Sequence, residues 1–299
     1  MTTAGPWLPW PLSRWRWFTA PVPAERLAAL RIGLAAVLLV DILWTYLPGR
    51  LDFYGTEGVA GPIRRNASLG IGPAWSLFSD ESPALVLVAL TLWAFAALGL
   101  LLGFRSRTCA ATAWAMGMSF HTLNPWIENA GDSVRSIALL YLALSPCGAA
   151  WALDARGERG VEVHPWPIRL LTLQMMAIYF VNGLHKAVGI DWPEGRSIYH
   201  VMADFSLTRW SSAQWQLPYP LTRLMTWAVL VWELCFPALM LSRWTRPATL
   251  CVGVLFHVGL LVVLELGLFP LYMLCLYLPF VPWERFDSTN SLTGRSDLC

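Results

Sequence analysis

Nine ionisable side chains stand within or at the ends of long apolar stretches of the sequence, where hydrocarbon would surround them unless the fold provides partners. They are Arg31, Asp41, His121, Asp132, Arg135, Lys186, Glu233, His257 and Glu265. A charged side chain at the centre of a membrane helix costs about 2.5–3.5 kcal/mol on insertion scales, so each of these positions is a candidate functional residue.

Lys186 is the most informative of the nine, because it is the only lysine among 21 lysine and arginine residues. A desolvated lysine can release its proton, whereas arginine effectively cannot, so an amine at this position could serve as a base or as a Schiff-base nitrogen. The alternative is a lysine whose ammonium group simply extends to the membrane interface. The residue types alone leave both interpretations open.

Other polar residues could form a site with this lysine. The spacing of Tyr179, Asn182 and Lys186 is i, i+3, i+7, which predicts one stripe of a helix facing protein or a cavity. His257, in the middle of an apolar run, is either a satisfied core imidazole or the polar wall of a binding site. Glu233 is expected to pair with a buried arginine or with Lys186.

The remaining ionisable residues favour structural roles. Asp132 and Arg135 are one helical turn apart, so a local ion pair is favoured there. Arg31 and Asp41 are ten residues apart and do not share a helix face, so each is expected to pair with another helix. Glu265 is expected to cap a break before the last span. The histidines and cysteines lack the spacing of metal ligands, and no metal is expected.

The composition indicates which environment must hold these residues. The 299 residues are 56% hydrophobic and 13% charged, with a mean hydropathy of +0.51, whereas soluble domains carry about 25% charged residues. The net charge is only +2 and the basic residues are dispersed, which excludes a nucleic-acid-binding surface. We therefore expect an all-α integral membrane protein, in contact with lipid.

About eight apolar stretches are long enough to be membrane helices, which predicts a polytopic bundle. They cover residues 27–47, 83–104, 108–126, 133–153, 166–187, 221–242, 246–265 and 267–283. The last two form one run that as a single helix would be about 50 Å long, so a break is expected between Glu265 and Pro270.

Basic residues predict the orientation of this bundle. A cytoplasmic N-terminus places arginines in all the short loops of the inner side, as the positive-inside rule requires. The longer connections, residues 48–82 and 188–220, then lie on the outer side. In the second, hydrophobic residues from Ile198 to Trp210 recur near helical spacing, which indicates either an amphipathic helix on the membrane or an ordinary folded loop.

Several segments resemble one known family. Residues 179–186 (YFVNGLHK), followed by residues 191–195 (DWPEG), resemble the signature region of vitamin K-dependent gamma-glutamyl carboxylases. That family shares its membrane domain with the horizontally transferred transmembrane (HTTM) proteins. Other similar segments, in the same order, are Leu30–Gly33 with Asp41, Gly99–Arg107, and Phe256-His257 followed by Gly267–Phe269. The resemblance implies a leader at 1–23, an HTTM-like transmembrane domain at 24–286 and a tail at 287–299.

The resemblance also implies a reaction. In the family, the lysine matching Lys186 deprotonates the hydroquinone of vitamin K; oxygen addition then gives an epoxide and a strong base that removes a γ-proton from glutamate, so that CO2 can attack. Lys186 is thus the expected catalytic base. The substrate-binding candidates are Tyr179, Asn182, His257, Asp132 and Glu233. The implied cofactors are a reduced quinone of the menaquinone or vitamin K type, O2 and CO2.

Three features depart from the carboxylase pattern. His185 precedes Lys186 where the animal enzymes have a second lysine, and Asp132 aligns where they have a histidine. The chain ends soon after its last span, so the soluble domain that recruits protein substrates is expected to be missing. Quinol oxidation or epoxidation without carboxylation is compatible with that loss, and a glutamate-containing exported peptide stays a possible partner.

Two other functions remain open from the sequence. The chain could be a non-catalytic membrane partner in the maturation or export of a peptide, or a small-solute transporter. The absence of a visible internal repeat and the single titratable amine count against transport. The high ratio of arginine to lysine suggests a GC-rich bacterial genome, hence a bacterial cytoplasmic membrane and menaquinone rather than dietary vitamin K.

Overall fold

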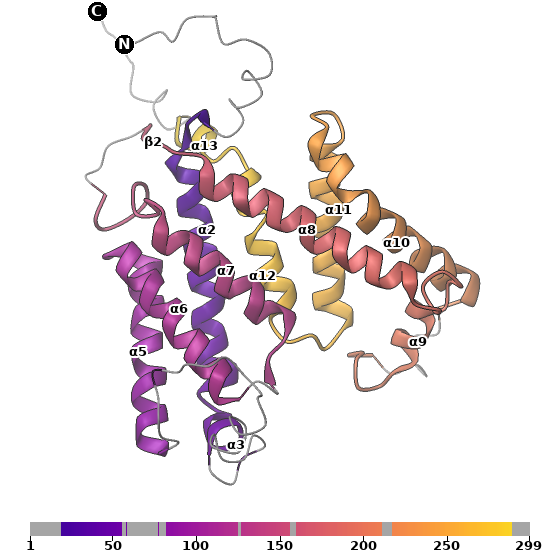
Figure 1. Ribbon diagram of the computed structural model, residues 1–299, viewed down its shortest axis with the longest axis horizontal. Helices are drawn as coiled ribbons and strands as arrows, with labels where there is room; N and C mark the ends of the chain where they lie inside the picture. Colours follow the sequence, from indigo (N-terminus) through magenta and orange to yellow (C-terminus); the bar gives the residue numbers. More distant parts are fainter. Residues whose placement is uncertain are drawn as a thin grey trace, which may run out of the picture. The chain divides into compact units, whose positions relative to one another are not determined.

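The computed structural model describes residues 19–55, 58, 77, 82–124, 127–155, 160–210 and 217–288. The helices are α2 (Ala24–Asp41), α3 (Arg50–Tyr54), α5 (Pro83–Leu102), α6 (Ser106–Leu123), α7 (Ala130–Leu144), α8 (Trp166–Val188), α9 (Ser197–Ala203), α10 (Tyr219–Leu241), α11 (Arg246–Val263), α12 (Phe269–Cys275) and α13 (Glu284–Ser288) (Figure 1). A π-helical segment, η2 (Ile42–Tyr46), continues α2, and a 3-10 turn, η4 (Leu278–Phe280), follows α12.

The chain divides into two compact units. The first comprises Met1–Glu128, Arg135–Leu170 and Leu278–Cys299, and the second comprises Asn129–Val134 and Leu171–Tyr277. Within the first unit, α5 packs against α2 and α6. Helix α5 begins where Ser82 Oγ accepts a hydrogen bond from Leu85 N at 3.3 Å, and it ends at Gly103, whose φ of +75° favours glycine.

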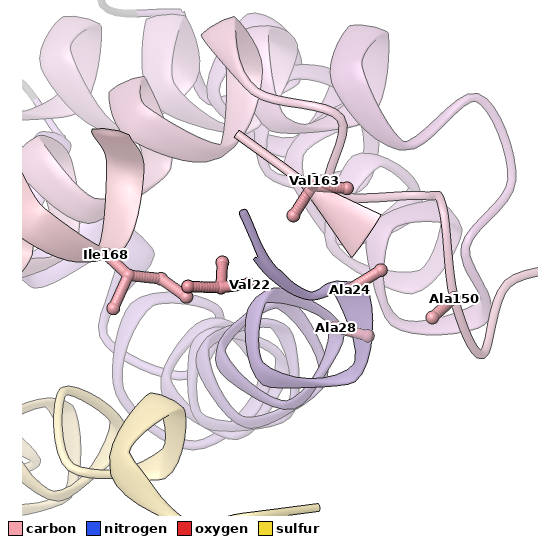
Figure 2. Packing of buried hydrophobic residues seen from close by; sticks show 6 residues of the cluster. All are labelled: Val22, Ala24, Ala28, Ala150, Val163 and Ile168. Carbon is pink, nitrogen blue, oxygen red and sulfur yellow. The ribbon is translucent and has the colours of Figure 1, made fainter. Parts of the chain in front are cut away.

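A short antiparallel strand pair joins two distant segments of the first unit. Strand β1 (Val22–Pro23) pairs with β2 (Glu162–Val163), with Val22 opposite Val163. These valines form a buried cluster with Ala24, Ala28, Ala150 and Ile168 (Figure 2). Because alanine side chains are small, the turn around Ala150 can pack closely against the start of α2, and this packing holds the turn in place.

The second unit contains most of α8 and all of α9 to α12. The predicted break between the last two apolar stretches is confirmed, because α11 ends at Val263 and α12 begins at Phe269. Gly267 between them has a φ of +57°, a conformation that an L side chain rarely adopts. Glu265 N donates to Leu207 O at 2.7 Å and Arg209 binds the Glu265 carboxylate at 2.8 Å, so this residue anchors the break to the loop after α9.

Four segments of the described chain are long and apolar enough to cross a membrane: Ala24–Tyr46, Pro83–Leu102, Tyr219–Leu241 and Arg246–Val263. The expected number of eight is therefore not confirmed. Helix α7 has 15 residues and stops before Ser145-Pro146, where the proline ring disfavours helical backbone in the preceding residue. Helix α12 has only seven residues. Helix α8 has 23 residues, but Gln174, Asn182 and Lys186 lower its hydropathy.

The two predicted outer loops differ in how far they are described. Most of residues 48–82 lie outside the described residues, as do the greater parts of the leader and the tail. In the second loop, the predicted amphipathic helix is shorter than expected, because α9 ends before Asp204 and Phe205 is 91% exposed. Ile198 N donates to Thr226 Oγ1 of α10 at 3.2 Å, so α9 is a docked helix of the second unit.

Candidate functional site

Lys186 and Glu233 meet where α8 and α10 come close together. Their Nζ and Oε1 atoms are 2.6 Å apart. The approach depends on Gly183, one turn before the lysine, where an added Cβ would lie 3.0 Å from Leu234 N of α10. Glycine therefore permits the close packing that carries the carboxylate to the amine. This geometry confirms the alternative in which Glu233 pairs with Lys186.

The two partners of this pair differ in their surroundings. The Glu233 side chain is 4% exposed, whereas that of Lys186 is 24% exposed. Lys186 Nζ also lies over the Trp192 ring, 4.3 Å from its centroid, which is a favourable cation–π geometry. Glu233 Oε2 is buried without a hydrogen-bond partner among the described residues. One carboxylate oxygen therefore has capacity to accept or hold a proton.

A second polar group in the same unit consists of three buried side chains: Tyr179 of α8, His257 of α11 and Tyr277, which follows α12. Tyr179 Oη lies 2.6 Å from His257 Nε2 and 2.5 Å from Tyr277 Oη. Each phenol has one hydrogen, so two arrangements satisfy these contacts: Tyr277 donates to Tyr179 and Tyr179 to Nε2, or Nε2 donates to Tyr179 and Tyr179 to Tyr277. In both, His257 Nδ1 has no hydrogen-bond partner among the described residues.

Aromatic side chains of α10 connect the two polar groups. Trp232 precedes Glu233 and packs edge-on against Tyr179, with ring centroids 4.8 Å apart. Phe236, one turn later, lies 4.1 Å from the same tyrosine. The aromatic ring of Phe269 lies 5.9 Å from that of His257. The polar groups of α8, α10 and α11 are thus embedded in aromatic surroundings.

Two predicted site residues have other contacts. Asn182 is exposed, and its amide donates to Ile178 O of its own helix at 2.7 Å. Asp132 Oδ2 accepts from Asn129 N at 2.8 Å, while Asn129 Oδ1 accepts from Gly131 N at 2.7 Å. This reciprocal pattern is a capping box at the start of α7. These hydrogen bonds do not connect Asn182 or Asp132 to the Lys186–Glu233 pair or to the Tyr179–His257–Tyr277 group.

The first unit contains a separate buried ion pair. Arg135 Nη1 of α7 lies 3.2 Å from Asp41 Oδ2 of α2, which confirms that Asp41 pairs with another helix. The guanidinium also faces the rings of Tyr46 and Trp93, at 5.7 and 5.1 Å from their centroids. The local pair of Arg135 with Asp132 stays a prediction.

Arg31 is fully buried and binds backbone rather than a carboxylate. It donates to the carbonyls of Leu100, Ala150 and Trp151, at 3.3, 3.4 and 2.5 Å. These include a carbonyl at the C-terminal end of α5, where a cation is favourable. The expected pairing with another helix is therefore confirmed, but its acceptors are carbonyl groups. His121, also among the nine, pairs with Glu128 at 2.7 Å.

Two residues of the second unit, Tyr277 and Trp192, were not predicted as site residues from the sequence. Tyr277 is one aromatic residue in a uniformly apolar stretch, and its contact with Tyr179 depends on the return of the chain after Gly267. Trp192 could have been noticed, because it lies in the DWPEG segment six residues after the lysine.

Comparisons with known proteins identify the domain. Residues 76–284 match the family of HTTM domains, which is more than half of the chain. Comparison with curated proteins and with solved structures gave no match. The matched range includes the Lys186–Glu233 pair and the Tyr179–His257–Tyr277 group. The chain therefore belongs to the HTTM domain family.

Proposed function

We propose that this chain is a quinol-dependent oxygenase of the membrane, an epoxidase or a carboxylase, in which Lys186 is the base. The observation that carries the proposal is the 2.6 Å contact between the only lysine of the chain and Glu233, a carboxylate with a second, unpartnered oxygen. The high ratio of arginine to lysine supports a bacterial cytoplasmic membrane, and the arginines of the short inner loops support a cytoplasmic N-terminus.

The pair can take up one proton from a bound hydroxyl group, which changes the net charge of the pair from zero to +1 and leaves the negative charge on the substrate. As an ion pair it already holds one proton, on Nζ of Lys186. Transfer of that proton to Glu233 gives a neutral amine beside a neutral acid, a form that an apolar environment favours over separated charges. The amine of Lys186 can then accept a second proton from a bound hydroxyl group. Glu233 is therefore a necessary part of the base in this proposal.

The other polar group fits a ligand with oxygen atoms and an aromatic ring. His257 Nδ1 and Trp232 Nε1 are buried nitrogens without partners among the described residues. Together with Tyr179 they would hold the head group of a reduced quinone, whose chemistry is to reduce O2 and give the quinone epoxide and water. Carboxylation would in addition consume CO2, which would replace a γ-proton removed by a base from a glutamate in an exported peptide. Asn182 and Asp132 stay candidates for contacts outside this group.

The decisive experiment measures oxygen-dependent turnover of reduced menaquinone or vitamin K by purified protein in nanodiscs. Quinone and epoxide are followed by mass spectrometry for the wild type, Lys186→Ala and Lys186→Arg. Arginine keeps the positive charge opposite Glu233 but cannot act as a base, so it is the matched control for folding. We expect epoxide from the wild type and none from either variant. Equal turnover by Lys186→Arg would contradict the proposed role of the amine.

A non-catalytic role is the second candidate, and one observation favours it. Lys186 is already satisfied by Glu233 and by the Trp192 ring, as a purely structural lysine would be. In that case the protein would bind an exported peptide without chemistry. Co-purification of a peptide with both the wild type and Lys186→Arg, together with no quinol turnover, would favour this function.

A further inference from the structure

A pocket of about 400 Å³ lies beside the first turn of α6 in the first unit. Its lining includes Arg105, Ser106, Arg107, Thr108, Gly148 and Asp154. Helix α5, a candidate membrane span, ends at Leu102, just before this turn. The pocket therefore lies at the end of a span, where a membrane protein meets the layer of lipid head groups.

The first turn of α6 provides a positive environment in this pocket. The first intrahelical hydrogen bond of α6 is donated by Cys109 N to Arg105 O at 3.0 Å. The backbone N–H groups before it, those of Ser106, Arg107 and Thr108, therefore have no acceptor within the helix. Among the described residues, no side chain caps this end. Unpaired N–H groups and the helix dipole favour an anion at such a position, and two arginines add to the attraction.

A buried hydroxyl supplies an independent indication of a ligand. Ser106 is 4% exposed, and its Oγ has no hydrogen-bond partner among the described residues. The Oγ lies beside Gly148, another residue of the pocket wall, where an added Cβ would be 2.7 Å from it. A buried hydroxyl without a hydrogen-bond partner costs free energy of folding. A ligand in the pocket that accepts a hydrogen bond from this hydroxyl would remove that cost.

The rest of the surroundings fit a lipid with a positive group beside its phosphate. Asp154 brings a carboxylate to the same wall, which suits an ammonium group and disfavours a simple anion. Exposed apolar side chains stand nearby in the sequence: Leu102 is 50%, Phe104 53% and Leu153 69% exposed. Acyl chains could lie against such side chains while the head group occupies the pocket.

We propose that this pocket binds the phosphoethanolamine head group of a membrane phospholipid. The phosphate is held by the first turn of α6, Ser106 Oγ and Arg105, and the ammonium by Asp154. Arg107 Nε donates to Ala143 O of α7 at 3.3 Å, so this guanidinium also ties the pocket to the end of α7. The proposal is independent of the oxygenase function, because none of these residues belongs to the second unit.

The test measures binding of short-chain phosphatidylethanolamine to the full-length protein in detergent by isothermal titration calorimetry. The matched phosphatidylcholine, phosphoethanolamine and inorganic phosphate are the comparison ligands. The variants are Ser106→Ala, Arg105→Gln and Asp154→Asn. Ser119→Ala is the control, since Ser119 is a buried serine of the same helix whose hydroxyl donates to Ala115 O at 2.8 Å. Removing the unpartnered hydroxyl of Ser106 should not impair folding.

We expect phosphatidylethanolamine to bind most tightly and Ser106→Ala or Arg105→Gln to weaken it by about tenfold, as the loss of one charge-assisted hydrogen bond predicts. Asp154→Asn should abolish the preference for ethanolamine over choline, and Ser119→Ala should bind normally. Inorganic phosphate binding as tightly as the lipid would show a free-anion site and overturn the proposal. Unchanged binding by Ser106→Ala and Arg105→Gln would also overturn it.

Discussion

The asymmetric burial of the Lys186–Glu233 pair predicts an asymmetric response to mutation. Removing one partner of a buried ion pair typically costs about 3–5 kcal/mol, because the other charge stays buried alone. Lys186→Met leaves a Glu233 side chain that is only 4% exposed, so we expect a loss of about 3–4 kcal/mol in the free energy of unfolding. Glu233→Gln leaves an ammonium that is 24% exposed and lies over Trp192, so about 1–2 kcal/mol is expected.

The double variant Lys186→Met/Glu233→Gln separates the pair energy from the individual losses. It contains no unpaired charge, so it should be more stable than Lys186→Met alone, and the coupling energy should be about 2–3 kcal/mol. The gross attraction of unit charges 2.6 Å apart is about 6 kcal/mol at an effective dielectric constant of about 20, and desolvation offsets part of it. The coupling energy must therefore lie below that value.

The assay is reversible unfolding in mixed micelles with increasing sodium dodecyl sulfate, followed by the fluorescence of the 18 tryptophans. Glu265→Gln is the control, because Glu265 forms an exposed pair with Arg209 in which the side chains are 51% and 36% exposed. Exposed pairs contribute less than about 1 kcal/mol. A coupling energy below about 0.5 kcal/mol, or a larger loss for Glu233→Gln than for Lys186→Met, would refute the burial argument.

Three further predictions concern structure. Arg31→Met should lower the free energy of unfolding by about 2–4 kcal/mol, because three backbone carbonyls lose a charged donor; a loss below about 0.5 kcal/mol would contradict this. Gly253→Ala should cost about 1–3 kcal/mol, because its Cβ would overlap the Tyr277 ring and hydroxyl, whereas the Cβ of Gly259→Ala on the same helix meets no described atom within 4 Å and should be tolerated. Arg26, whose guanidinium hydrogen-bonds Glu284, holds the pKa of that carboxyl below its usual range. The stability difference between wild type and Glu284→Gln should therefore be present at neutral pH and disappear as pH falls through this lowered pKa; a difference that persists in acid would contradict it.

The pairing of Lys186 with Glu233 was predictable from the sequence because charged residues are scarce in its apolar stretches. Few carboxylates lie in apolar stretches, so Lys186 had few available partners, and Glu233 was among the residues named for it. Helical geometry was less decisive for Asn182. At about 100° per residue, positions i and i+7 differ by about 20°, whereas i+3 is about 60° away from i. Tyr179 and Lys186 therefore share a narrow face, and Asn182 stands beside it, exposed.

Contacts that depend on tertiary packing could not be predicted. The partners of Arg31 are carbonyl groups, and no side-chain pattern marks a carbonyl acceptor. The pairing of Tyr277 with Tyr179 requires both the break at Gly267 and the packing of α12 on α11. In contrast, the role of Asp132 was encoded locally, because asparagine followed three residues later by an acidic residue is a capping pattern, which the ion-pair interpretation overlooked.

The choice of lysine at position 186 is itself an argument about function. Elsewhere in the described chain, arginine forms the cationic side of the ion pairs of Asp41, Glu265 and Glu284. For a purely structural pair with a buried carboxylate, arginine is the better residue, because its planar guanidinium can make two parallel hydrogen bonds and is less strongly hydrated. Glu233 Oε2 has no partner among the described residues, and an arginine could have supplied the second donor that it lacks. Lysine gives up that contact and retains a property arginine does not have, an amine that can release its proton when it is desolvated, and a base at this position needs that property.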